Sequence, residues 1–514
     1  MSYRYSHLLP TIARQFPVVS LQQHIHDSLA IASGPFTSAR WWRLWLRKLL
    51  LIAARSVEAL TGRTLYVEDT LGALRAFRPE TRSFLAWCDQ NGYLRQWEYN
   101  LLRPFYPKIC TLNLSATKFS SPSGRKFPFY GTVGSGGGLT LEQAVQTSLG
   151  EFVERWSVAD WRSENDLRTG TYQKLINDGA IDPQRLMIYT QDQDPSAALQ
   201  EETMLSWVSG TNALTKQRVL LPAAGQYLFF NREHPHEPVF RESNTNGTAA
   251  HVNTTKASLS ATLELVERDA FLRMWYQKQI PEQLPLTTVQ SLAPHLKTIL
   301  EELAVCGVTT QFIDISTDLK LPVLALVTTT KQGPYGVRVH VACGLNPASL
   351  FEQLVVDALK SLHAQQSQVH QETKEQLLRE YHSGSVLRSI EDRSRLWNLH
   401  EMATEVAWLT TGPQYTQREF LSRHENAFGV GKTNTQAQYA FVLERFRQAE
   451  CSLYLIGMTG PIARRAGLQV VRAVSPELIP MFFNEQKPPR NCRRFTHNEA
   501  GQEVQHNATP HPFV

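Results

Sequence analysis

GGGLTLEQAVQTSLGEFVERWSVADW, residues 136–161, is the stretch that decides how this chain is expected to fold. Apolar residues recur in it at helical spacing, and Thr140 with the polar residues after it predicts where the helix begins. The helix carries the pentapeptide Glu-Phe-Val-Glu-Arg at residues 151–155, and the pattern Glu-x-x-Glu-Arg returns at residues 264–268. Each copy follows a segment rich in glycine or asparagine. The chain therefore contains a weak internal repeat of a loop followed by a helix.

The second pentapeptide lies in KASLSATLELVERDAFLRMWY, residues 256–276, which also predicts a helix. Carboxylates three residues apart project from one face of a helix, and oxygen ligands are those that hard divalent cations prefer. Cations held there could in turn hold nucleotide phosphates. The candidate acids are Glu151, Glu154, Glu264 and Glu267. The alternative is that each copy is a surface ion pair with its own arginine, Arg155 or Arg268.

The composition indicates an ordinary globular protein. The chain has 514 residues, of which 42% are hydrophobic and 19% charged, enough for two or three domains or one large unit. A net charge of +5 is small for this length and does not suggest nucleic acid binding. The six cysteines include no C-x-x-C pair, so neither a zinc knuckle nor a disulfide framework is expected.

The N-terminal region carries no recognisable signal peptide. The most apolar segment there, residues 40–60, contains five Arg and Lys side chains, so no apolar run reaches the roughly 18 residues that a membrane span needs. We expect this segment to be a packed or partner-docking helix, and the protein to be cytoplasmic with no membrane span.

Further along the chain, strand patterns alternate with long helical ones. Residues 1–110 are mostly helical, with a possible strand at residues 65–69, and residues 120–138 look like a polar, glycine-rich connector. Strands are expected at residues 204–208, 219–224, 309–315, 321–327, 453–458 and 468–474. This mixture favours a mixed α/β architecture of the α+β class.

Several motifs together resemble a known family. In chain order they are the opening stretch, WVSGTNAL (207–214), LLPAAGQYLFF (220–230), NTNGTAA (244–250), LELVERDAFLRMWY (263–276), GLQVVRAVSPELIPMFF (467–483) and PHPFV (510–514). Their order and spacing resemble the YcaO superfamily, and more narrowly the D-type component of azoline-forming peptide cyclodehydratases. The resemblance runs from about residue 110 to the end of the sequence.

The resemblance implies ATP-dependent cyclodehydration of Cys, Ser or Thr residues of a ribosomally made peptide to thiazoline or oxazoline rings. It implies ATP and Mg2+ as cofactors, with the four acids as metal ligands. Ser148, Arg155 and Arg268 would lie on the phosphate side or support the acids. The C-terminal tail of such proteins reaches toward the active site, so the resemblance assigns Pro510, Pro512 and Val514 to catalysis, the last through its terminal carboxylate.

The resemblance also implies a division of the chain and a set of partners. Residues 1–110 would form an N-terminal extension for partner docking, residues 111–500 a YcaO-like ATP-binding domain, and residues 501–514 the tail. The partners would be the precursor peptide and a leader-peptide-binding protein, either ubiquitin-activating-enzyme-like or carrying a RiPP-recognition element. A flavin-dependent azoline dehydrogenase and a second copy of the chain are further candidates.

The sequence departs from the family at the nucleotide site. Where the family has Asn and Glu before its second acidic helix, this chain has Val252 and Lys256, with Asn253 one residue from the expected Asn. The third family helix usually carries Glu and then Gln, and the best register here gives Asp357 and Lys360. A Lys in place of a metal-facing acid repels a dication unless it contacts phosphate.

These departures leave alternatives open. The chain could be a degenerate YcaO-like scaffold that binds a peptide or a partner protein. It could also use the same ATP site for another backbone modification, such as thioamide or amidine formation.

Overall fold

The computed structural model describes most of the chain from residue 77 onward. The described residues are 49–50, 53, 77–99, 102–103, 106–121, 123–129, 133–161, 167–190, 192–193, 199–331, 333–364, 371–383 and 390–513. The possible strand at residues 65–69 and most of the segment at residues 40–60 lie outside them.

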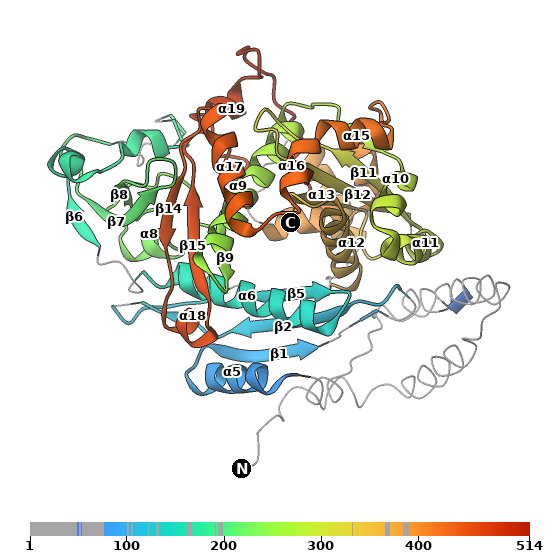
Figure 1. The fold of residues 1–514 in the computed structure, drawn as a ribbon, viewed down its shortest axis with the longest axis horizontal. Helices are drawn as coiled ribbons and strands as arrows, with labels where there is room; N and C mark the ends of the chain where they lie inside the picture. The colour runs from blue at the N-terminus through green and yellow to red at the C-terminus, as the bar shows by residue number, and fades with distance from the viewer. Residues whose placement is uncertain are drawn as a thin grey trace.

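A small antiparallel sheet carries the first acidic helix (Figure 1). Its strands are, in order across the sheet, β1 (Leu94–Tyr99), β2 (Cys110–Ala116) and β5 (Gly134–Gly138). Helix α6 (Leu141–Ala159) packs on β5 and β2, and α5 (Pro79–Gln90) lies against β1. Thr140 caps α6, since its hydroxyl accepts from the Gln143 N–H while the Gln143 side chain accepts from the Thr140 N–H. The predicted start of this helix is therefore confirmed.

The glycine run of β5 exists because α6 lies so close to it. A Cβ atom at Gly136 would lie 2.1 Å from the Ala144 carbonyl oxygen, and one at Gly134 would lie 2.5 Å from the Ser148 carbonyl oxygen. On the other face, a Cβ at Gly137 would lie 2.6 Å from the Lys360 side chain. The prediction of a glycine-rich connector at residues 120–138 is therefore wrong at its end, where residues 134–138 form the largely buried strand β5.

A larger sheet holds the second half of the repeat. Its order is β6-β7-β14-β15-β9, with β8 paired to β7, and all pairings are antiparallel. The strands are β6 (Arg168–Gly170), β7 (Leu205–Asn212), β8 (Arg218–Pro222), β9 (Thr248–His251), β14 (Tyr454–Gly457) and β15 (Gln469–Val474). Strand β9 leads into α9 (Thr254–Tyr276) much as β5 leads into α6. Each repeat is thus a strand followed by a helix.

Helix α9 is the central core element. It packs against β15 and β9 of this sheet and against β13 of a third, four-stranded sheet. That sheet has the order β10 (Glu282–Leu284), β11 (Val308–Asp314), β12 (Val323–Thr330) and β13 (Val337–Cys343). In the second half of α9 every residue from Asp269 to Tyr276, more than two turns of helix, is buried. A helix that is buried on all sides belongs to the interior of a large core.

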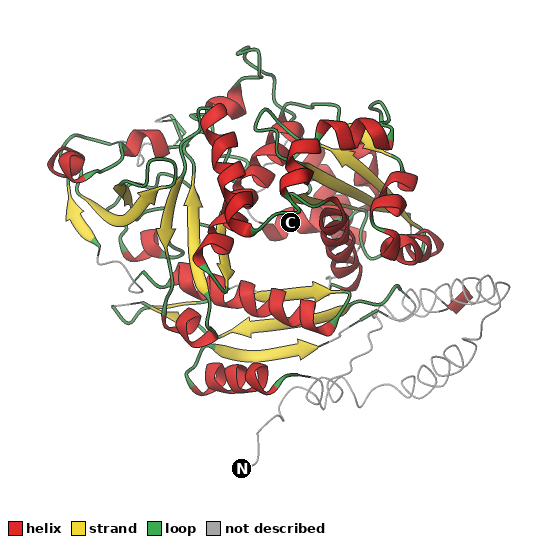
Figure 2. Ribbon diagram, in the orientation of Figure 1, coloured by secondary structure: helices red, strands yellow, loops and turns green. Residues whose placement is uncertain are grey.

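The remaining elements surround this core (Figure 2). The strands are β3 (Phe119–Ser120) and β4 (Lys126–Phe127). The helices are α7 (Tyr172–Leu175), α8 (Phe230–Glu233), α10 (Leu286–Leu292), α11 (Lys297–Val305), α12 (Pro347–His363), α13 (Gln371–His382), α14 (Ile390–Trp397), α15 (Gln417–Arg423), α16 (Glu425–Val430), α17 (Thr435–Gln448), α18 (Pro461–Ala466) and α19 (Arg493–Thr496).

The α+β class is confirmed, and six of the expected strands correspond to β7, β8, β11, β12, β14 and β15. The other strands were not predicted, namely β1, β2, β3, β4, β5, β6, β9, β10 and β13. Because β1 pairs with β2, one sheet includes residues on both sides of position 110; the division of the chain into domains there stays a prediction. In the described part of the chain, no helix combines the length and the apolar character that crossing a membrane requires.

Candidate functional site

Three helices bring five carboxylates into one cluster. Helix α6 supplies Glu151 and Glu154, α9 supplies Glu264 and Glu267, and α12 supplies Asp357. Burial raises the pKa of Glu154 and of Asp357; the negative charges of Glu264 and Glu151 add to the rise at Glu154, and that of Glu151 adds to the rise at Asp357. We call these five residues the acid cluster. The two copies of the sequence pattern therefore face each other across one site.

Glu151 is held by the edge of the glycine strand. Its Oε2 accepts a hydrogen bond of 2.6 Å from the Ser135 backbone N–H, and its Oε1 lies 2.6 Å from Nη2 of Arg155. Ser148, one turn earlier on α6, is buried and donates its hydroxyl to the Gly134 carbonyl at 3.3 Å. Ser148 thus contacts β5 and helps to join the helix to that strand.

Arg268 joins the two acids of α9. Its Nη2 lies 3.4 Å from Oε1 of Glu264, and its Nη1 lies 3.1 Å from Oε1 of Glu267. Glu267 is buried, and its Oε2 accepts a hydrogen bond of 3.2 Å from the Cys343 N–H at the end of β13. The four-stranded sheet therefore holds one oxygen of this carboxylate and Arg268 holds the other.

Glu154, Glu264, Glu267 and Asp357 are held where ionisation is unfavourable. Loss of water around the carboxyl raises the pKa of Glu267 to about 7, with the charge of Glu264 adding to the effect and Arg268 opposing it. Desolvation is also the main cause that raises the pKa of Glu154, Glu264 and Asp357. Partly buried carboxylates that repel one another fit a bound divalent cation, which would favour their ionised state. The donor set is all oxygen and therefore suits Mg2+.

One member of the site was missed by the sequence reasoning. Arg472 on β15 is buried and donates to the carbonyl oxygens of Asn244 and Gly225, at 2.8 and 3.3 Å. Its positive charge partly offsets the rise in the pKa of both Glu154 and Glu264 that burial causes. Beside it lies a cavity of about 10 Å3, room for about one water, which Asn246 also lines. The available signal was a lone arginine within the apolar strand pattern QVVRAV.

Lys360 on α12 borders the acid cluster. Its Nζ lies 3.5 Å from Oδ1 of Asp357, and its aliphatic stem covers Gly137 of β5. Val252 and Lys256, by contrast, are exposed at the start of α9. Lys256 precedes Glu264 by eight residues, which is about 12 Å along a helix. Asn253 is the N-cap of α9 and accepts from the Lys256 N–H at 2.8 Å.

The C-terminal tail extends along α9 to the acid cluster. The Trp275 Nε1–H donates to the Thr509 carbonyl at 2.7 Å, and the guanidinium of Arg393 donates to the His511 carbonyl at 2.8 Å. The Phe513 ring then lies 4.0 Å from the guanidinium carbon of Arg268, a cation–π contact with the arginine that pairs with Glu264 and Glu267. Pro510 and Pro512 are buried. Val514 lies outside the described residues.

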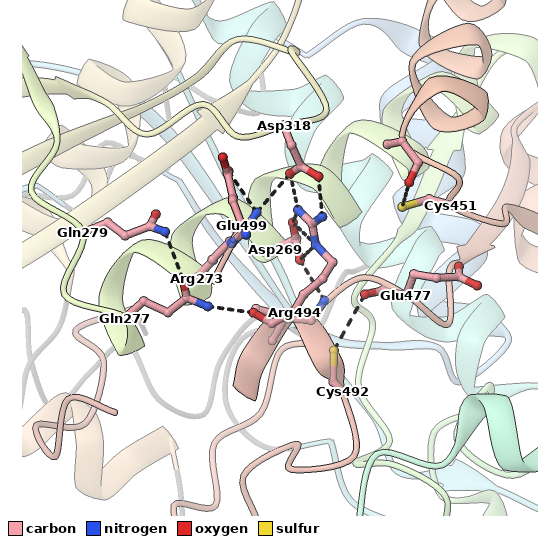
Figure 3. A network of polar contacts seen from close by, with 12 residues as sticks. Asp269, Arg273, Gln277, Gln279, Asp318, Cys451, Glu477, Cys492, Arg494 and Glu499 are labelled. Carbon is pink, nitrogen blue, oxygen red and sulfur yellow. Dashed lines mark hydrogen bonds and ion pairs between the residues drawn. The ribbon is translucent and has the colours of Figure 1, made fainter. Parts of the chain in front are cut away.

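A polar network anchors the segment that precedes this tail (Figure 3). Asp269, fully buried and next to Arg268, pairs with Arg494 of α19 at 2.7 Å and accepts from the Ile479 N–H at 2.9 Å. Arg494 also pairs with Asp318 at 2.7 Å, and Arg273 pairs with the same aspartate at 3.0 Å. The network ties α19 to the helix that carries the second pair of acids.

Comparison with solved structures supports the fold. A heterocyclase in complex with substrate and cofactor is similar with a TM-score of 0.64 and 17% identity over 88% of this chain and 59% of that chain. The heterocyclase TruD gives 0.52 and 19% over 73% and 51%. YcaO from Methanopyrus kandleri bound with AMPPCP and Mg2+ gives 0.51 and 16% over 77% and 91%. The chain thus spans little more than half the length of the two heterocyclases.

Comparison of sequences gives the family. No curated protein matches the chain. The family model described as YcaO cyclodehydratase, ATP- and Mg2+-binding, matches residues 135–479, more than half of the chain, and both acidic pentapeptides fall within that range. This description agrees with ATP and Mg2+ as the expected cofactors. The chain therefore belongs to the YcaO family.

Proposed function

We propose that this protein catalyses ATP-dependent cyclodehydration of Cys, Ser or Thr residues in a ribosomally made peptide. The observation that carries the proposal is the acid cluster, in which carboxylates from α6, α9 and α12 face one another beside Arg268, Arg472 and the C-terminal tail. Family membership and the likeness of the fold to heterocyclases support it.

In this proposal Glu151, Glu154, Glu264 and Glu267 hold Mg2+ together with the phosphates of the nucleotide. When bound, ATP supplies the phosphoryl group that makes the former amide oxygen a leaving group. The peptide then loses one water for each ring formed, and ADP and phosphate are released. Arg155 and Arg268 keep the carboxylates in place, and Ser148 holds α6 against β5.

The tail, with Pro510, Pro512 and Val514, would border the peptide at the reacting amide. The stacking of Phe513 on Arg268 supports this role, because it brings the tail to an arginine of the acid cluster. Proline has a fixed φ and no backbone donor, which favours an extended, semi-rigid segment of this kind.

The first experiment asks whether the nucleotide site works. Purified full-length protein is titrated with ATP in the presence and absence of Mg2+. We expect Mg2+-dependent binding that Glu264→Gln abolishes. The matched control is Glu352→Gln, since Glu352 lies on α12 but contacts His295 and Gln143 outside the acid cluster. Absence of binding at millimolar ATP would instead support the degenerate scaffold, with Lys360 neutralising Asp357 in place of a metal.

The second experiment asks for the chemistry. A precursor peptide rich in Cys, Ser and Thr, encoded beside the gene, is incubated with the protein, ATP and a co-encoded leader-binding protein of the ubiquitin-activating-enzyme-like or recognition-element type. We expect the peptide to lose one water per ring and to gain no sulfur or nitrogen. A thioamide product would change its mass differently and would overturn the azoline assignment. If azoline rings form, a co-encoded flavin-dependent dehydrogenase added to the reaction should remove two hydrogens from each ring.

A further inference from the structure

A second cluster of side chains of the types that bind metals lies outside the acid cluster, beside strand β7 of the six-stranded sheet. The segment His234-Pro-His-Glu237 follows α8, next to β7 and β8 (Figure 1). The ligand atoms of His234, His236 and Glu237 all lie within 4.8 Å of one another. The turn that brings them together is closed by the Glu237 N–H, which donates to the His234 carbonyl at 3.1 Å.

Glu237 is the unusual member, because it is a buried acid. The residue is only 5% exposed. Ser206 of β7 donates to both of its oxygens, from the backbone N–H to Oε2 at 3.1 Å and from the hydroxyl to Oε1 at 2.7 Å. Within the described residues, no lysine or arginine forms an ion pair with it. Buried carboxylates are usually paired with a cation or bound to a metal, and here the two imidazoles are the neighbouring groups.

The imidazole of His234 is held in a fixed position. It stacks on the Phe230 ring at 4.3 Å with an interplanar angle of 21°, and the Trp161 ring lies edge-on to it at 6.5 Å. The ring of His236 lies 5.9 Å from that of His234 and is exposed. Aromatic packing therefore orients His234, and Ser206 orients Glu237. His236 faces solvent, from which a metal could enter.

We propose that His234, His236 and Glu237 bind one divalent transition metal ion of the Zn2+ type. Two imidazole nitrogens and one carboxylate suit such an ion, whereas the all-oxygen acid cluster suits Mg2+. Three protein ligands leave a fourth tetrahedral position for water. Ser206 acts on the metal through Glu237, as a positioning residue that orients the carboxylate. The site is independent of the proposed cyclodehydration.

The test measures retained metal rather than activity. Full-length protein is stripped with chelator, loaded with Zn2+ in excess Mg2+, dialysed and analysed for metal. We expect one equivalent of Zn2+, and for Co2+ loading the visible absorption of a tetrahedral site. His236→Asn, a change at an exposed side chain that does not endanger folding, should lose that equivalent. Ser206→Ala should weaken Zn2+ binding by about 10- to 100-fold.

Two variants give matched controls. His295→Asn alters an exposed histidine that contacts Glu352 instead, and it should keep the full equivalent. Glu264→Gln alters the acid cluster and should also keep it, which separates this site from the Mg2+ site. Absence of retained Zn2+ in the wild type, or an unchanged equivalent in His236→Asn, would overturn the proposal.

Discussion

Glu267→Gln tests whether the acid cluster holds unfavourable charge until a cation binds. Burial raises the pKa of Glu267 from its usual 4.5 to about 7. One pKa unit corresponds to about 1.4 kcal/mol, so the shift corresponds to about 3 kcal/mol. The folded protein holds the carboxyl proton of Glu267 more tightly than the unfolded chain does. The protonated side chain therefore contributes this free energy to the stability of the fold below pH 4.5, and the contribution is lost as pH rises through 7. Glutamine keeps the shape and an acceptor for the Cys343 N–H but cannot ionise.

The assay is urea unfolding of metal-free wild type and variant at several values between pH 4.5 and 8. We expect the variant to gain about 3 kcal/mol in free energy of unfolding relative to the wild type between those limits. Added Mg2+ should stabilise the wild type, more strongly at pH 8 than at pH 6, because the ligands must be deprotonated. A difference between the two proteins that does not change with pH would refute the assignment of a raised pKa to Glu267.

Two further predictions concern packing and the anchor of the tail. Gly136→Ala should destabilise the protein by about 3 kcal/mol or prevent folding, because its Cβ would meet a carbonyl oxygen of α6 at 2.1 Å. Gly150 lies on α6 itself and has open space around it, so Gly150→Ala should instead stabilise the protein by about 1 kcal/mol in thermal unfolding. Arg494→Gln should cost about 3 to 5 kcal/mol by leaving Asp269 buried without its partner, whereas the exposed neighbour Arg493→Gln should change the unfolding midpoint little.

The repeat of acids was predictable because helical periodicity is local. Spacing alone indicated that Glu151 and Glu154 share a face of α6. The strand before them was not predictable, since glycine disfavours strands and the reason for the run at residues 134–138 is the approach of a helix that local pattern does not reveal. Arg472 was missed for a related reason: its sequence neighbours are strand residues, and its acidic neighbours lie far away in the chain.

The charged departures from the family pattern have different consequences once their positions are known. Lys256 is exposed about two helical turns before Glu264, so its charge acts on the acid cluster through solvent and is weakened by salt. Lys360 pairs directly with Asp357 in the cluster. Lys256 is therefore compatible with a working nucleotide site, whereas the effect of Lys360 must be measured by the nucleotide titration.

The position of the acids depends on the same contacts that build the core. The glycines of β5 allow α6 to approach, and this approach brings the Ser135 N–H to Glu151. Helix α9 is buried between two sheets, and its last turns hold the tail through Trp275 and α19 through Asp269. A change in this packing would move carboxylates whose pKa values depend on one another. Mutations at β5 should therefore alter Mg2+ affinity as well as stability, although no glycine there is a ligand.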